Sequence, residues 1–172
     1  MEPLNHTTST GKIQRLIREL DNRDGLQRQQ ARLALVDIGQ TAVPALIDAL
    51  DAPQENVRWE AAEALCNLHA PAAAPQLVQA LEDRSIDVRW AAARALIGLG
   101  RQALPSLLQA LVYHFDSPWL REGAYHILHR LQASGSLLPT EAELLKDLGG
   151  FIPAIERIPW AAEVALAELD ED

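Results

Sequence analysis

The sequence has one cysteine, Cys66, among 172 residues. A single cysteine can form neither an intrachain disulfide nor a cysteine-rich metal site. Runs of Val, Ile, Thr and Tyr, which are typical of β-strands, are missing, and aromatic residues make up only 5% of the chain. No apolar run approaches the length of a transmembrane helix, and the first residues lack the apolar stretch of an export signal. We therefore expect a helical, cytoplasmic protein.

Positive charge is also scarce. The chain has 15 Lys and Arg against 24 Asp and Glu, so its formal net charge is −9. Nucleic acids and anionic membrane surfaces are bound mainly through Lys and Arg, which neutralise phosphate groups. We expect neither a nucleic acid nor a membrane as a partner.

Alanine and leucine are abundant, and they recur in a fixed pattern. The segment NVRWEAAEAL at 56–65 returns 31 residues later as DVRWAAARAL. A period of this size is typical of a solenoid, in which each unit buries its apolar face against its neighbours. Within each unit the apolar residues have the i, i+3, i+4 spacing of two amphipathic helices. The predicted fold class is an all-α superhelix of about five antiparallel helix hairpins.

Proline and glycine mark the ends of these helices. Pro44, Pro75 and Pro105 recur just inside the first helix of a unit, where the missing N–H had no intrahelical partner. Gly39 and Gly100 follow second helices and are predicted C-caps. The predicted starts of second helices are Asn56, Asp87 and Ser117.

We expect a flexible tail at 1–9 and a single repeat domain at 10–172. Its repeats are predicted at about 10–39, 40–69, 70–100, 101–135 and 136–169, the last being a degenerate capping repeat. Residues 158–166 can be aligned on residues 57–65. That alignment predicts that Trp160 occupies the place of Trp59 on a second helix.

The core Val-Arg-Trp-x-Ala-Ala-x-Ala-Leu follows a helix with the pattern Pro-x-Leu-x-x-Ala-Leu. With a period near 31, this chain resembles HEAT-like repeats, and it is most similar to the short class first described in phycobilisome lyases. The resemblance covers residues 12–132 well and 140–169 weakly. It implies a right-handed superhelix whose second helices line the concave side and serve as a binding surface for a protein partner.

A helical wheel places one set of second-helix positions opposite the core, and these positions vary between repeats. Exposed tryptophan is common in binding hot spots, so Trp59 and Trp90 are the predicted anchors of a partner protein. The alternative is that both rings fold onto the neighbouring repeat and are largely buried. The complete predicted binding set is Trp59, Trp90, Trp160, Glu60, Glu63, Asn67, Arg94, Glu122, His126 and Arg130.

Four arginines recur at one repeat position: Arg28, Arg58, Arg89 and Arg121. In HEAT-like repeats such an arginine commonly pairs with acidic residues or carbonyls of the turns. Arginine suits this role because its planar group can bind a carboxylate with two hydrogen bonds. We therefore expect a structural ladder rather than a ligand site. Glu63 and Arg94 occupy matching places in neighbouring repeats and are predicted to pair.

Other functions have weaker support in the sequence. Glu122, His126 and His129 share one helix face and could supply metal ligands, but no further ligand is identifiable, so we predict no metal. A bilin lyase or chromophore chaperone is the main alternative, and a HEAT-type DNA glycosylase is disfavoured because acidic residues would repel phosphate. We expect no cofactor and no catalytic residue, and a monomer. The partner is expected to offer a basic or apolar surface.

Overall fold

The computed structural model describes residues 4–150 and 155–169, and this part of the chain contains helices and no strands. The helices are α1 (Leu4–Glu19), α2 (Gly25–Ile38), α3 (Val43–Ala49), α4 (Glu55–Leu68), α5 (Ala74–Gln79), α6 (Ile86–Leu99), α7 (Leu104–His114), α8 (Pro118–Ala133), α9 (Pro139–Leu148) and α11 (Ile158–Leu169). Short 3-10 turns lie at Gly39–Ala42, Pro71–Ala73, Ala80–Glu82 and Gly100–Ala103. The predicted all-α solenoid is confirmed.

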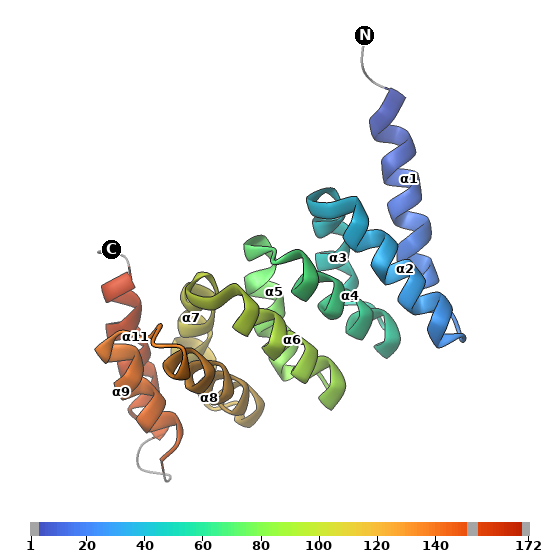
Figure 1. Ribbon diagram of the computed structural model, residues 1–172. Helices are drawn as coiled ribbons and strands as arrows, with labels where there is room; N and C mark the ends of the chain where they lie inside the picture. The colour runs from blue at the N-terminus through green and yellow to red at the C-terminus, as the bar shows by residue number, and fades with distance from the viewer. Residues whose placement is uncertain (1–3, 151–154, 170–172) are drawn as a thin grey trace.

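The helices form two layers that follow an arc (Figure 1). One layer contains the second helices α2, α4, α6 and α8, each packed against the next. The other contains α1, α3, α5 and α7, and the two ends of the chain lie at opposite ends of the arc (Figure 1). We call the side of α2, α4, α6 and α8 that points away from the other layer the second-helix face.

Small side chains allow the second helices to pack closely. Ala61 and Ala64 of α4 and Ala92 of α6 are fully buried. Large aliphatic side chains fill the space between the layers, and Leu65, Leu77 and Leu96 are each at most 1% exposed. Close-packed interiors lose stability when a side chain changes volume, so these positions specify the register of the stack.

The helix ends agree with most of the sequence predictions. Pro44, Pro75 and Pro105 lie in the first turns of α3, α5 and α7. Gly39 and Gly100 cap α2 and α6 with φ of 78° and 61°, a backbone conformation that disfavours residues with a Cβ atom.

Two of the predicted N-caps are two residues too late. Ser117 is the N-cap of α8, and its hydroxyl accepts a hydrogen bond from the Leu120 amide at 3.3 Å. Asn56 and Asp87 instead lie inside the first turns, because α4 and α6 begin after Gln54 and Ser85. An acidic or amide side chain is favourable at either place, so composition alone did not distinguish them.

Residues 4–9, for which the sequence predicts a flexible tail, form the beginning of α1. Once the packed turns around Ile13 and Leu16 are formed, each further helical residue adds a hydrogen bond without a new nucleation cost. Residues 1–3 lie outside the described residues.

The last helix pair is arranged differently from the prediction. α9 packs against α8 and continues the second-helix layer, whereas α11 packs against α7 and α9. The aligned segments 158–166 and 57–65 therefore lie in different layers. Both are rich in alanine and leucine, and such an apolar face can cover either side of the stack. Ile158 and Ala162 of α11 are fully buried, and the helix covers the α7 end of the layer that contains α1, α3, α5 and α7.

By length and composition, one stretch of the described residues, Ile86–His114, could cross a membrane. In the structure this stretch is not one helix, because Gly100 separates α6 from α7. Each of the two helices is shorter than the roughly 20 residues that a bilayer requires. Their leucines Leu96, Leu104 and Leu108 are fully buried in the protein core.

Candidate functional site

The four recurring arginines make the same contact in each of the first four repeats. The Nη1 atom of each donates to the carbonyl oxygen six residues earlier, in the turn that precedes its helix. These bonds are Arg28 to Asn22 at 2.9 Å, Arg58 to Ala52 at 2.9 Å, Arg89 to Asp83 at 2.8 Å and Arg121 to Phe115 at 2.7 Å. Each arginine thus closes the hairpin of its own repeat.

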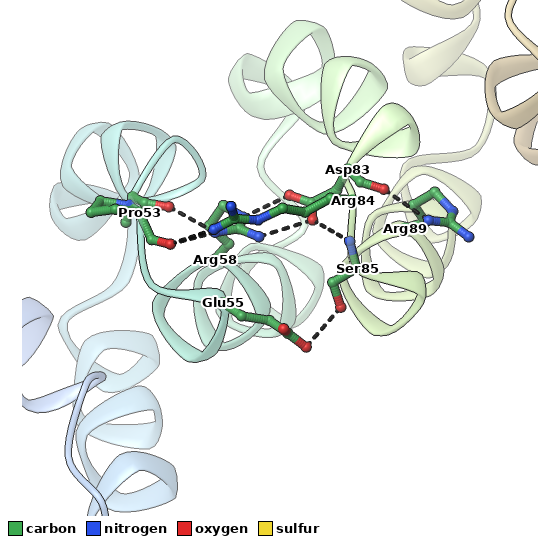
Figure 2. Close-up of polar contacts among 8 residues, drawn as sticks. Pro53, Glu55, Arg58, Asp83, Arg84, Ser85 and Arg89 are labelled. Carbon is green, nitrogen blue, oxygen red and sulfur yellow. Dashed lines mark hydrogen bonds and ion pairs between the residues drawn. The ribbon is translucent and has the colours of Figure 1, made fainter.

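Arg58 also joins two repeats (Figure 2). Its Nε and Nη2 atoms donate to the two carboxylate oxygens of Asp83 at 2.6 and 3.0 Å. Burial alone would raise the pKa of Asp83, but the hydrogen bonds from Arg58 and from the Ser85 amide outweigh burial and lower it. The same hydrogen bonding to Asp83 raises the pKa of Arg58, because it favours the charged guanidinium.

A chain of ion pairs crosses the second-helix face from α2 to α6. Glu60 lies 3.5 Å from Arg28 and 3.4 Å from Arg32, and Arg32 lies 3.8 Å from Glu63. Glu63 in turn pairs with Arg94 of α6, which confirms the predicted pair. The charged side chains of this ion-pair chain, which lies between α2 and α6, are therefore already paired within the protein.

The prediction that Glu60 binds a partner is wrong. Its side chain is 2% exposed, because it lies under the two arginines of α2 and cannot reach a second protein. Burial raises the pKa of Glu60, and the charges of Arg32 and Arg28 oppose that effect. Glu60 is a structural residue that holds α4 to α2.

Trp59 is only partly the surface anchor that the sequence predicted. Its ring packs against the hydrophobic core, and the Arg32 guanidinium lies 5.6 Å from the ring centroid. Such a cation–π contact covers one face of the indole. The buried-ring alternative is therefore the better description of Trp59.

Trp90 is different, because its side chain is 45% exposed and forms the wall of a pocket. The pocket lies between α6 and α8 and leaves about 30 Å³ of free space. Its lining residues are Leu81, Ile86, Arg89, Trp90, Ala93, Trp119, Glu122, Gly123 and His126. We call this the α6–α8 pocket. Its lining combines aliphatic side chains, two indole rings and charged groups of both signs.

Trp119 is a pocket residue that the sequence reasoning missed. It is 47% exposed, and the guanidinium of Arg89 lies 5.0 Å from its ring centroid. In the aligned repeats its place is held by Leu26, Asn56 and Asp87. A large aromatic side chain where the two preceding repeats have a polar one was the available signal. The core does not need a tryptophan in the first turn of a helix.

Glu122 and His126 reach the same pocket. His126 meets Trp90 edge to face, with ring centroids 4.8 Å apart and planes at 86°. His129 instead lies 5.9 Å from the ring of Tyr125. Within residues 4–150 and 155–169 no three His, Cys, Asp or Glu side chains are grouped as metal ligands.

The remaining predicted residues lie apart from the pocket. The Asn67 side chain donates to the Glu63 carbonyl at 2.9 Å, and Arg130 is exposed on α8. Trp160 is 62% exposed, but it belongs to α11 and does not extend the row of Trp59 and Trp90. Burial raises the pKa of the Cys66 thiol, which disfavours the reactive thiolate.

Several solved structures are similar to this one. A chain in the complex of CpcE and CpcF of phycocyanin lyase from a Nostoc species is 24% identical, with a TM-score of 0.60. The alignment covers 90% of this chain and 99% of that chain. A designed armadillo repeat protein is 19% identical over 93% of this chain and 92% of its own, with a TM-score of 0.37. Another, in complex with the peptide (KR)4, is 20% identical over 94% and 84%, with a TM-score of 0.39.

No curated protein matches the sequence. The family model described as HEAT repeats matches residues 13–85 and 74–150, which is more than half of the chain. With its stacked hairpins, its two layers and its arginine-closed turns, the chain belongs to the HEAT-repeat family.

Proposed function

We propose that this protein is a scaffold that binds a partner protein on its second-helix face, with the α6–α8 pocket as the anchor. The observation that carries the proposal is the pair of half-exposed indoles, Trp90 and Trp119, which line the pocket together with the buried residues Leu81 and Ala93. Tryptophan is enriched in binding hot spots because it buries a large rigid surface. The core gains little from either ring at these positions.

The contrast along the face supports this location. Between α2 and α6, Glu63 and the arginines around it are paired with one another, and Trp59 lies under Arg32. Between α6 and α8 the indoles of Trp90 and Trp119 remain about half exposed. A surface that leaves large apolar groups open to water is typical of an interaction site.

The polar residues around the pocket suit a specificity role. Glu122 lines the pocket and is exposed, and His126 lies against the Trp90 ring. Polar groups at the rim of an interface select partners and orient them more than they add affinity. The net charge of −9 favours a partner whose remaining surface is apolar or basic.

Repeat proteins of this type bind protein partners, as CpcE does in its complex with CpcF. A chromophore would need more room than the α6–α8 pocket offers. Pockets for small molecules of drug size enclose about 300–1,000 Å³, roughly ten times or more the free space here. This difference favours a protein side chain over a tetrapyrrole as the occupant.

The test is affinity purification from the native host with the double variant Trp90→Ala/Trp119→Ala. We expect the partner to be lost while the melting temperature falls by only a few degrees, because both rings are half exposed. Trp160→Ala is the matched control, since this exposed tryptophan lies on α11 in the other layer. A double variant that retains the partner would refute the proposal.

A second measurement addresses the chromophore alternative directly. The purified protein is mixed with biliverdin and its visible absorbance is recorded. A new band that disappears in the double variant would replace the scaffold proposal with a tetrapyrrole-binding function.

A further inference from the structure

We infer that Arg89 is a subsite for a carboxylate of the bound partner. The segment that enters the α6–α8 pocket then carries an acidic residue beside an aliphatic one. This inference rests on the proposed function and specifies the chemistry of its partner.

Arg28 and Arg58, the first two of the four recurring arginines, show that an arginine at this repeat position can hold a carboxylate. Arg28 lies 3.5 Å from the Glu60 carboxylate, and Arg58 lies 2.6 Å from that of Asp83. In both cases the carboxylate comes from the following repeat. Each arginine therefore closes its own hairpin through Nη1 and meets the acid through other nitrogens, Nε in Arg28 and both Nε and Nη2 in Arg58.

At Arg89 the acid is missing. Counting six residues back from the ladder arginines, Phe115 stands where the preceding repeat has Asp83. Phe115 packs against the core and offers no charge. Within the described chain Arg89 has one hydrogen bond, from Nη1 to the Asp83 carbonyl, and no ion pair. Its Nε and Nη2 donors are left for a group from outside.

The surroundings of Arg89 determine what else the ligand carries. Its guanidinium lines the α6–α8 pocket, beside Trp90 and against the ring of Trp119. Leu81, Ala93 and Gly123 form part of the lining, and the missing side chain of Gly123 is what allows Leu81 to lie so close to α8. About 30 Å³ leaves room for a small aliphatic group, since one water needs roughly 10–15 Å³ by this measure.

Another charged group near the pocket weakens the preference for a carboxylate but does not reverse it. Glu122 lines the pocket and is exposed, so it repels a carboxylate through solvent. Direct hydrogen bonds from a guanidinium to a carboxylate are short and strong, whereas exposed charges are screened over about 8 Å. Contact with Arg89 therefore decides the local preference, and the net charge of −9 acts on the partner at longer range.

The probes are three capped tetrapeptides, acetyl-Gly-Leu-Asp-Gly-amide and the same peptide with Asn or with Lys in place of Asp. Binding is followed in ¹⁵N-labelled protein by the indole N–H signals, assigned with Trp90→Phe and Trp119→Phe. We expect the Asp peptide to shift both signals and to bind about tenfold more tightly than the Asn peptide, as a charge-assisted hydrogen bond contributes. Acetyl-Gly-Leu with a free C-terminus tests whether a chain-end carboxylate serves better than a side chain.

Two matched variants separate this role from a structural one. Arg89→Gln removes the charge and the planar fork but keeps a polar side chain, so it should bind the Asp and Asn peptides equally. Arg121→Gln makes the same change in the next repeat, where the arginine closes its turn but does not line the pocket. That variant should keep the tenfold preference. If the preference survives in Arg89→Gln, Arg89 is not the subsite.

Equal binding of the Asp and Asn peptides, or tighter binding of the Lys peptide, would overturn the inference. So would the absence of any shift at millimolar peptide. None of these results removes the proposed function, which depends on loss of the native partner from the double tryptophan variant.

Discussion

The carboxylate of Asp83 accepts hydrogen bonds from both Nε and Nη2 of Arg58, although the two residues belong to successive repeats (Figure 2). The Arg58 side chain is 6% exposed and that of Asp83 is 10% exposed. A bidentate pair with so little solvent around it fixes the distance and angle between neighbouring hairpins. This pair links the second repeat to the third beside the α4–α6 contact.

Arg58→Lys should lower the free energy of unfolding by about 3 kcal/mol, since breaking a buried ion pair leaves Asp83 without its fork of donors. Urea denaturation followed by circular dichroism measures the change. The control is Glu19→Gln, which removes the exposed pair of Arg15 and Glu19 and should cost less than about 0.5 kcal/mol. Similar losses for both variants would show that burial does not strengthen the Arg58 pair.

The lowered pKa of Asp83 predicts that the protein loses stability in acid. Its pKa is lower in the folded protein than in the unfolded chain, where an aspartate titrates near 4. The stabilisation is therefore present above about pH 4 and disappears as the pH falls through the lower folded pKa. Unfolding free energies of the wild type and Asp83→Asn should differ most at neutral pH and converge in strong acid. A difference that does not change between pH 7 and pH 2 would contradict this assignment.

The raised pKa of Glu60 predicts the opposite trend, a gain of stability as the pH falls, in a higher pH range. Because burial raises its pKa in the folded protein, the folded state takes up its proton before the unfolded chain does. The wild type should therefore gain stability relative to Glu60→Gln as the pH falls through the folded pKa, until the unfolded chain is protonated near pH 4. Parallel stability curves for the two proteins from pH 7 to pH 4 would mean that Glu60 is not desolvated.

The repeats could be predicted because burial imposes the same demand on every unit. Ala61 and Ala92 occupy the same position in successive repeats and are fully buried, and the leucines around them recur at the same spacing. The positions of the prolines and of Gly39 follow from backbone geometry that any such hairpin requires. A sequence shows these constraints directly because they are local or periodic.

The candidate site depended on neighbours that the repeat pattern does not encode. Trp59 and Trp90 hold the same place in consecutive repeats, yet Arg32 covers Trp59, whereas Trp90 meets His126 at its edge and stays 45% exposed. The identity of the residue on the adjacent helix decides the exposure of each ring. The same limitation placed Trp160 on the wrong layer, since an apolar pattern does not say which side of the stack it covers.

Gly123 is predicted to be required for the close approach of α8 to Leu81. A Cβ atom at Gly123 would lie 3.0 Å from Leu81 Cδ2 and 3.2 Å from Cδ1, and Leu81 is almost fully buried. Gly123→Ala should therefore cost about 1–3 kcal/mol through overpacking, in spite of the better helix propensity of alanine. Gly11→Ala in α1, where nothing lies within 4 Å of the new atom, is the control and should be neutral or stabilising. A stabilising Gly123→Ala would show that Leu81 can move aside.

Glu122 is predicted to weaken the binding of an acidic segment at the α6–α8 pocket. It is the pocket's carboxylate, it is exposed, and no ion pair within the described residues neutralises it. Glu122→Gln removes the repulsion and keeps the size of the side chain, so the Asp tetrapeptide should bind about two- to fivefold more tightly at low salt. The gain should shrink as salt is added, because the interaction passes through solvent. Titration of the indole N–H signals at two salt concentrations measures both effects, and weaker binding by Glu122→Gln would mean that Glu122 contacts the ligand as an acceptor.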